Sequence, residues 1–280
     1  MPGPRSRCEL PTWLNDHHSW TSLDSSIQLH INSGEKSFKL KNLQDVIHPE
    51  YSHVSCHDIV KKEKNIVKLV TYVKSGCDSG FVCSVFIQEA HNVIKVQFGH
   101  KARIPAEACS DLYFSSSVIK SLLLVSKATS IDSCPMSGRY KISPHSPLPI
   151  THCPKPSSLH LVSGCGSSAL TVEYQCSSQN RTKTEYSCKA HWTTPGQRTN
   201  IILSSHTSSQ LMCLSYTENQ GYLSSHSCHT ELHHNTFNIS QSGPCVQALS
   251  SVSLARCLVS SLPTLIILLS SSVFCTVRTI

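Results

Sequence analysis

Charged side chains are scarce in this 280-residue sequence. Asp, Glu, Lys and Arg make up 15% of it, well below the roughly 25% of an average globular chain. The net charge of +7 is spread thinly, and the densest basic run, residues 61–68, is interrupted by Glu63 and followed by apolar residues. Such a run is typical of the solvated edge of a strand or helix, and a patch for a polyanion or a lipid headgroup is the less favoured alternative. We expect no nucleic-acid partner.

Sequence signatures of catalysis are also missing. The chain contains no G-x-S-x-G elbow, no phosphate-binding glycine loop and no dinucleotide-binding turn. Ser and His are so abundant that a Ser/His/Asp trio can be named almost anywhere, and naming one therefore carries no information. We predict that the protein is not an enzyme and uses no cofactor, and we disfavour the hypothesis of a secreted hydrolase.

Paired C-x-x-C knuckles, which structural zinc sites prefer, are absent from the sequence. Its 17 His include a cluster in residues 228–234, with the sequence CHTELHH. This cluster lacks the H-E-x-x-H spacing of a zinc protease, and Cys188 with His191 would supply only half of a site. We interpret these histidines as surface residues and predict no metal site.

The first 20 residues contain no apolar run of the kind that forms a secretory signal. Near the other end, residues 258–277 carry no charge and are just long enough to span a hydrocarbon core. Four interpretations are open: a lipid-anchor signal, a spanning helix flanked by Arg256 and Arg278, the tail anchor of a cytosolic protein, and a buried helix. We favour the first two, behind a linker of residues 246–257, with the start of the chain incomplete.

Fifteen Cys are many for a chain of this length and are typical of an ectodomain whose modules are each held by disulfides. Thirteen of them fall into two regions, which we predict to be domains of residues 1–125 and 134–245. Because the first region holds an odd number, one of its cysteines is free, bridges to the other region or has a partner upstream of Met1. The five are Cys8, Cys56, Cys77, Cys83 and Cys109.

The second region holds eight cysteines, which allow 105 pairings, so that the connectivity does not follow from sequence. Local sequence favours two bridges in the chain. Cys77 and Cys83 flank a turn that contains Gly, and Cys176 and Cys188 lie on adjacent strands of a predicted hairpin. The eight predicted disulfide cysteines of the second region are Cys134, Cys153, Cys165, Cys176, Cys188, Cys213, Cys228 and Cys245.

Two N-x-S/T sequons, at Asn180 and Asn238, are candidate glycosylation sites. Both fall in polar sequence that we expect to form loops, with Asn180 in a hairpin turn. Together with the density of cysteine they favour passage through the endoplasmic reticulum over a reduced cytosolic site.

The apolar segments are short and rich in β-branched residues, and turn residues separate them. This pattern predicts antiparallel strands in a meander. We therefore predict an all-β, disulfide-rich fold, mainly an antiparallel meander or sandwich-like, with two small domains and a C-terminal hydrophobic helix. The expected strands include residues 66–73, 81–87, 93–98, 139–142, 159–162, 169–176, 184–192, 200–204 and 211–216, whereas residues 118–125 are ambiguous between strand and helix.

An ordered series of cysteines and aromatic residues resembles a family of uncharacterised arthropod cell-surface proteins built from consecutive cysteine-rich domains of unknown function. A C-P-x-x-G-x-Y opening is followed by a G-C step, a C-x-x-x-W strand and a C-x-x-Y strand. The resemblance implies a secreted or surface-anchored, β-rich, non-enzymatic module with no known ligand. The matching residues are Cys8, Pro11, Trp13 and Trp20 in the first region, and Cys134, Pro135, Gly138, Tyr140, Gly164, Cys165, Cys188, Trp192, Cys213 and Tyr216 in the second.

The sequence as a whole predicts a cell-surface glycoprotein whose ectodomain is extracellular. Its C-terminal segment would attach it to the plasma membrane, by a lipid anchor or a single span. We expect a role in adhesion, ligand capture or surface structure, with an unidentified extracellular protein or glycan as partner. The alternative is a tail-anchored cytosolic protein with reduced thiols and a capacity to bind zinc.

Overall fold

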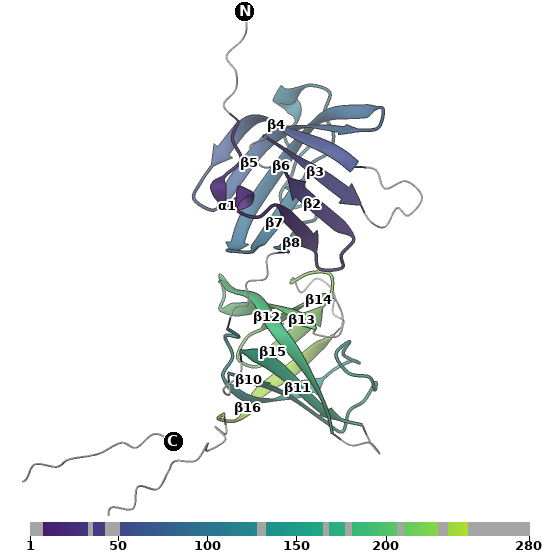
Figure 1. Cartoon of the computed structure of the whole chain (residues 1–280), viewed down its shortest axis with the longest axis vertical. Coiled ribbons are helices and arrows are strands. Elements are labelled where there is room, and N and C mark those ends of the chain that lie inside the picture. Colours follow the sequence, from purple (N-terminus) through teal and green to yellow (C-terminus); the bar gives the residue numbers. More distant parts are fainter. Residues whose placement is uncertain are drawn as a thin grey trace, which may run out of the picture. The chain divides into compact units, whose positions relative to one another are not determined.

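The computed structural model describes residues 8–32, 36–42, 51–127, 133–164, 168–176, 181–205, 210–228 and 235–245. Residues Met1–Gln247 belong to one compact unit, and its described part is almost entirely β-structure (Figure 1). None of the helices in these ranges is long and apolar enough to cross a bilayer. The predicted linker (246–257) and hydrophobic segment (258–277) lie outside the described residues.

Two eight-stranded antiparallel barrels make up the described chain. In each barrel every strand pairs with the next in sequence, and the last strand pairs with the first. The predicted all-β, disulfide-rich meander is confirmed, and the structure adds that each meander closes on itself, which leaves no sheet edge.

The first barrel follows a short helix, α1 (Thr12–Asn15), and includes one 3₁₀ turn, η1 (Pro105–Glu107). Its strands are β1 (Ser19–Ser22), β2 (Ile27–Ile31), β3 (Ser37–Asn42), β4 (Tyr51–Lys62), β5 (Ile66–Ser75), β6 (Asp78–Ala90), β7 (Val93–Phe98) and β8 (Leu122–Ser126). The ambiguous residues 118–125 thus end in a strand.

The second barrel begins and ends at neighbouring strands, β9 and β16. Its strands are β9 (Gly138–Pro144), β10 (Ser158–Ser163), β11 (Ala169–Gln175), β12 (Thr182–Thr194), β13 (Arg198–Ser205), β14 (Leu211–Tyr216), β15 (Gln220–Ser224) and β16 (Thr236–Gly243).

Alternation along the strands sorts side chains between the interior and the outer wall of each barrel. In β11, Leu170, Val172 and Tyr174 are buried in the core of the second barrel. In β3, Phe38 and Leu40 contribute to the core of the first barrel, while Lys39 and Lys41, which alternate with them, point outward.

Apolar side chains fill the interior of the second barrel. Ten of them line a cavity of only about 10 Å³, which is at the lower limit for one water molecule. In the first barrel, Leu14 of α1 is buried in the same core as Trp20 and Phe38, and the rings of Phe38 and Phe86 meet edge to face with their centroids 5.6 Å apart.

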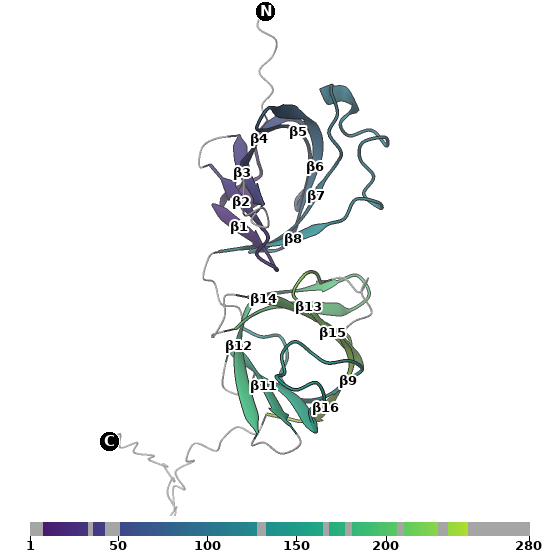
Figure 2. The ribbon, with the colours of Figure 1, turned by 90° about the vertical axis from the view of Figure 1, so that its right-hand side faces the viewer.

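The first barrel carries a second apolar layer on its outer wall. The connection between β7 and β8 runs outside the barrel (Figure 2), where Ala108 and Phe114 cover Val70 of β5 and Val85 of β6. A disulfide between Cys83 of β6 and Cys109 fixes this connection to the wall.

Five disulfides lie within the described residues, and Cys245 is also disulfide-bonded. Disulfides of this number indicate an extracellular or secreted domain. The five are Cys8–Cys56, Cys83–Cys109, Cys134–Cys188, Cys153–Cys176 and Cys213–Cys228. The predicted disulfide cysteine Cys165 lies outside the described ranges.

The predicted bridge between Cys176 and Cys188 is wrong, because the hairpin register separates the two residues. Tyr174 lies opposite Thr182 and Ala169 lies opposite Ser187, so Cys188 faces the far end of β11. Eight residues of strand, roughly 27 Å, separate it from Cys176, whereas a disulfide needs Cα atoms within about 7 Å.

The predicted bridge between Cys77 and Cys83 is also wrong. The turn of this hairpin is Gly76–Cys77, with Gly76 at φ +56° and Ser75 paired with Asp78. Cys83 therefore lies well along β6, where it meets Cys109. Cys77 is the free and exposed cysteine of the described chain, which accounts for the odd count in the first region.

Candidate functional site

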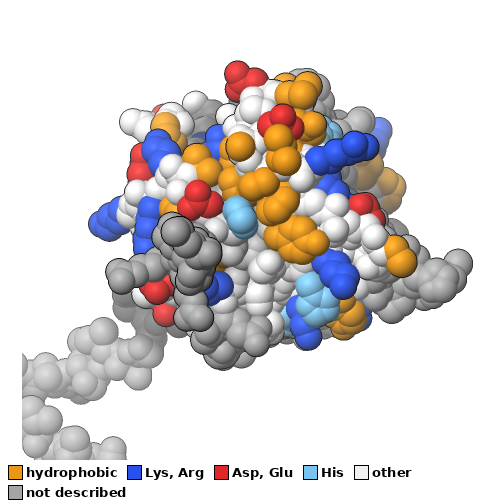
Figure 3. Space-filling model, turned by 90° about the horizontal axis from the view of Figure 1, so that it is seen from above, with side chains coloured by type: hydrophobic (Ala, Val, Ile, Leu, Met, Phe, Trp, Pro, Cys, Tyr) orange, Lys and Arg blue, Asp and Glu red, His pale blue; other side chains and the backbone are white. Residues whose placement is uncertain are grey.

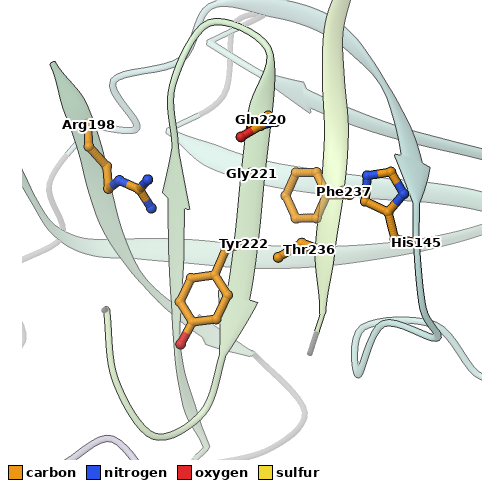
Figure 4. A pocket seen from close by; sticks show the side chains of 7 residues that line it. All are labelled: His145, Arg198, Gln220, Gly221, Tyr222, Thr236 and Phe237. Carbon is orange, nitrogen blue, oxygen red and sulfur yellow. The ribbon is translucent and has the colours of Figure 1, made fainter. Parts of the chain in front are cut away.

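The second barrel has a groove on its surface with a volume of about 160 Å³. Four stretches of chain line it. His145 follows the end of β9, Arg198 begins β13, and β15 contributes Gln220 to Tyr222 (Figure 4). Thr236 and Phe237, at the start of β16, complete the lining.

Gly221 gives the groove its shape. A Cβ atom at this position would lie 2.1 Å from Cε2 of Phe237, so only glycine lets the phenylalanine ring lie against β15. The ring of Phe237 is 2% exposed and belongs to the barrel core. The floor of the groove is therefore rigid core structure.

Polar side chains flank this floor. In Figure 4, Arg198 and His145 lie on opposite sides, with Gly221 and the ring of Phe237 between them. The backbone N–H of His145 donates to the carbonyl oxygen of Thr236 at 3.0 Å. Thr194 donates its hydroxyl to the carbonyl oxygen of Arg198 at 3.3 Å, so both basic residues are held by strand-end hydrogen bonds.

Two further hollows adjoin the groove. One of about 320 Å³ shares His145 and is lined by Lys155 and four prolines. Another of about 390 Å³ shares Gln220 and includes Gln197, Glu218 and Asn219. Together the three offer hydrogen-bond donors and acceptors beside an aromatic ring, a composition suited to a polar ligand.

The groove presents basic, amide and hydroxyl side chains beside one phenylalanine ring. Its lining contains no Ser, Cys, Asp, Glu or Lys side chain, so it presents no serine or cysteine nucleophile beside a general base. In the described residues no ion pair neutralises Arg198, which leaves its guanidinium for an acceptor group of a ligand.

The sequon at Asn238 lies beside the groove. Asn238 pairs with Gln220 across β15 and β16, and both Asn238 and Ser240 are exposed, while Ile239 between them is buried. The expectation of a loop is wrong here, because the sequon forms part of strand β16. Asn180 lies outside the described residues.

A cluster of charges occupies another part of the outer wall of the second barrel. The Glu173 carboxylate lies 2.9 Å from Arg139 and 3.0 Å from Lys183, with Arg181 at 3.8 Å. Burial opposes ionisation, but hydrogen bonds and the nearby cations outweigh it and hold the pKa of Glu173 below its usual value. This cluster fastens three strands together.

Several residues of the family motif contribute to the local structure of the barrels. Gly138 adopts φ +124°, and a Cβ there would meet the carbonyl oxygen of Gly243 at 3.0 Å. Tyr140 donates its hydroxyl to the carbonyl oxygen of Ser137, and burial raises the pKa of Tyr216. Among the other motif residues, Cys8 and Pro11 are buried, Trp13 and Trp192 are partly buried, and Pro135 is exposed.

The cysteines considered as zinc ligands are already bonded. Cys228 pairs with Cys213 and Cys188 pairs with Cys134, so neither is available to a metal. No cluster of three potential metal ligands occurs in the described ranges. The remaining histidines of the CHTELHH stretch lie outside them.

Sequence reasoning missed the groove. Arg198, Gln220 and Phe237 are far apart in sequence, and strand pairing alone brings them together. Gly221 lies inside strand β15, and a glycine inside a strand is the signal for a close approach of another side chain.

Residues 4–121 match the model of a family described as a domain of unknown function (DUF7043). This range contains most of the first barrel, including the connection outside its wall, and it is consistent with the expected uncharacterised domain. No curated protein matches the chain, and no solved structure matches it.

Proposed function

We propose that the protein is a non-enzymatic, extracellular binding module that captures a polar ligand at the groove of its second barrel. The ligand would be a glycan terminus or a peptide segment that carries an acceptor group for Arg198 and an apolar face for Phe237. Attachment to the plasma membrane through residues 258–277 and kinship with arthropod surface proteins remain part of this proposal.

The observation that best supports this proposal is that the groove combines a floor held by core packing with hydrogen-bond donors that flank it. Core packing holds Phe237 in place, so the groove is preformed and costs little conformational entropy to fill. Arg198 and His145 flank the ring, and the lining holds no serine or cysteine nucleophile, which supports binding over turnover.

The proposal is tested by applying the full-length chain to arrays of glycans and peptides, together with Arg198→Ala and the control Lys141→Ala. Lys141 is an exposed lysine of the same barrel outside the groove. We expect Arg198→Ala to weaken a specific array signal by about tenfold or more, and Lys141→Ala to retain it. Equal signals from all three proteins would refute the groove as the binding site.

Catalysis is tested separately. We expect no labelling of the full-length chain by a fluorophosphonate probe for serine hydrolases. Covalent labelling of a single serine, abolished by heat denaturation, would overturn the non-enzymatic interpretation.

A further inference from the structure

A row of basic side chains crosses the outer wall of the first barrel. Strand register places Ser19, His30, Lys39, His53 and Lys74 opposite one another in turn, from β1 to β5. The backbone N–H of Lys127 bonds to the carbonyl oxygen of Ser19 and extends the row. We call this surface the lysine face, and its members are His30, Lys39, Lys41, His53, Lys74 and Lys127.

These side chains point away from the core. Their neighbours Leu29, Phe38 and Val54 are buried inside the barrel, and alternation along each strand directs the basic residues outward. No described carboxylate forms an ion pair with Lys39, Lys74 or Lys127. Among the described residues, the lysine face therefore carries positive charge that no ion pair neutralises.

The second barrel shows how the same chain neutralises such a row. There Lys141, His160, Glu173 and Lys183 lie opposite one another across four strands, and the carboxylate of Glu173 pairs with the cations around it. Like charges on neighbouring strands are destabilising. The lysine face has no such carboxylate in its row.

The local electrostatics agree with this geometry. Burial lowers the pKa of His30, and Lys127, Lys41 and Lys39 lower it further. Two lysines of β3 and the lysine that follows β8 thus act on one point of the face. An anion placed there would relieve their repulsion and bring favourable Coulomb energy.

Aromatic rings border the lysine face. The Lys41 ammonium lies 5.2 Å from the centroid of the Tyr51 ring, and Tyr51 is 45% exposed. On the other side, Tyr72 packs against Phe81 with ring centroids 5.3 Å apart. Figure 3 shows one face of the molecule where hydrophobic side chains gather beside Lys and Arg side chains.

We propose that the lysine face binds a sulfated polysaccharide. The row from Ser19 to Lys74 crosses four strand intervals, about 19 Å around a curved wall. A flexible polymer with repeated anions can follow this curve, while a flat bilayer would meet only part of it. The exposed ring of Tyr51 offers a surface for the apolar side of a sugar.

The test measures binding of the full-length chain to heparin, with Lys39→Ala/Lys74→Ala as the variant. The matched control is Lys62→Ala/Lys64→Ala, which removes the same charge from the opposite end of the β4–β5 hairpin. We expect the face variant to bind roughly tenfold more weakly. Its salt dependence, log K against log salt, should be shallower by about 2, and the control should stay near wild type.

Further arms identify the ligand chemistry. N- and O-desulfated heparin should bind much more weakly than heparin, and Lys39→Arg/Lys74→Arg should retain binding. If the two alanine variants lost heparin binding equally, binding would depend on net charge alone, and the proposal would be overturned. Phosphatidylserine vesicles or polyglutamate that bind in place of heparin would also overturn it. The groove lies on the other barrel, so the experiment on the lysine face and the experiment on the groove can fail independently of each other.

Discussion

At the scale of single residues, Gly221 decides the shape of the groove. In Gly221→Ala the new methyl group would have to displace the ring of Phe237, and such overpacking destabilises a core by about 1–3 kcal/mol. Urea unfolding should show this loss. Gly243→Ala is the control, because a Cβ there meets nothing within 4 Å. Equal stabilities of the two variants would show that the ring has room to move.

Cys77 is the second residue that gives a testable prediction. Its thiol is exposed at a two-residue turn, while the other cysteines of the first barrel are bonded. We expect maleimide labelling of the native chain without reductant, followed by peptide mapping, to modify Cys77 and leave Cys83 and Cys109 unlabelled. Cys77→Ser should abolish that signal. Label on Cys83 would contradict the pairing described here.

At the scale of elements, alternation and turn residues predicted part of the fold. Residues 93–98 and 211–216 match β7 and β14 in full, because each is an apolar stretch bounded by turn sequence. The strands β1 to β3 were missed, since Gln28, His30 and Lys39 interrupt their apolar residues on the outer wall. The groove and the lysine face depend on register between strands, which local sequence does not determine.

The connection between β7 and β8 depends on one disulfide. In Cys83→Ala/Cys109→Ala, a closed loop of 26 residues is lost, and the chain-entropy model gives about 3 kcal/mol of lost stability. Limited proteolysis should then cut within residues 99–121. Cys213→Ala/Cys228→Ala, in the other barrel, should leave these residues protected. If wild type were cut within these residues at the same rate as the variant that lacks the disulfide, apolar packing and the disulfide would hold the connection only weakly.

Glu173 links the strands of the second barrel in a manner that depends on pH. Because its pKa is lowered in the folded state, the carboxylate stabilises the fold above its unfolded pKa of about 4.3. This contribution is lost as pH falls through the lower, folded value. Glu173→Gln should be less stable at pH 7 and show a flatter decline in melting temperature between pH 5 and 3. A parallel decline in both proteins would assign the acid sensitivity to other groups.

At the scale of the whole molecule, disulfides and sequons lead to one expectation about its route through the cell. The bonded cysteines of both barrels indicate an oxidising compartment. Asn238 and Ser240 lie exposed on β16, where a glycan would extend into solvent beside the groove. We expect the full-length chain from eukaryotic cells to shift on gels after N-glycosidase treatment. Asn238→Gln and Ser240→Ala should each remove the same step.

Gln241→Ala, outside the sequon, is the control for that experiment and should migrate as wild type does. Asn180→Gln tests the other sequon in the same way. The cytosolic alternative predicts the opposite pattern: no glycosidase shift, and thiol labelling of Cys134, Cys188 and Cys213 without reductant. The two patterns exclude each other, because oxidised cysteines and N-glycans are acquired along the same secretory route. A chain with neither would have folded without the disulfides that hold its two barrels.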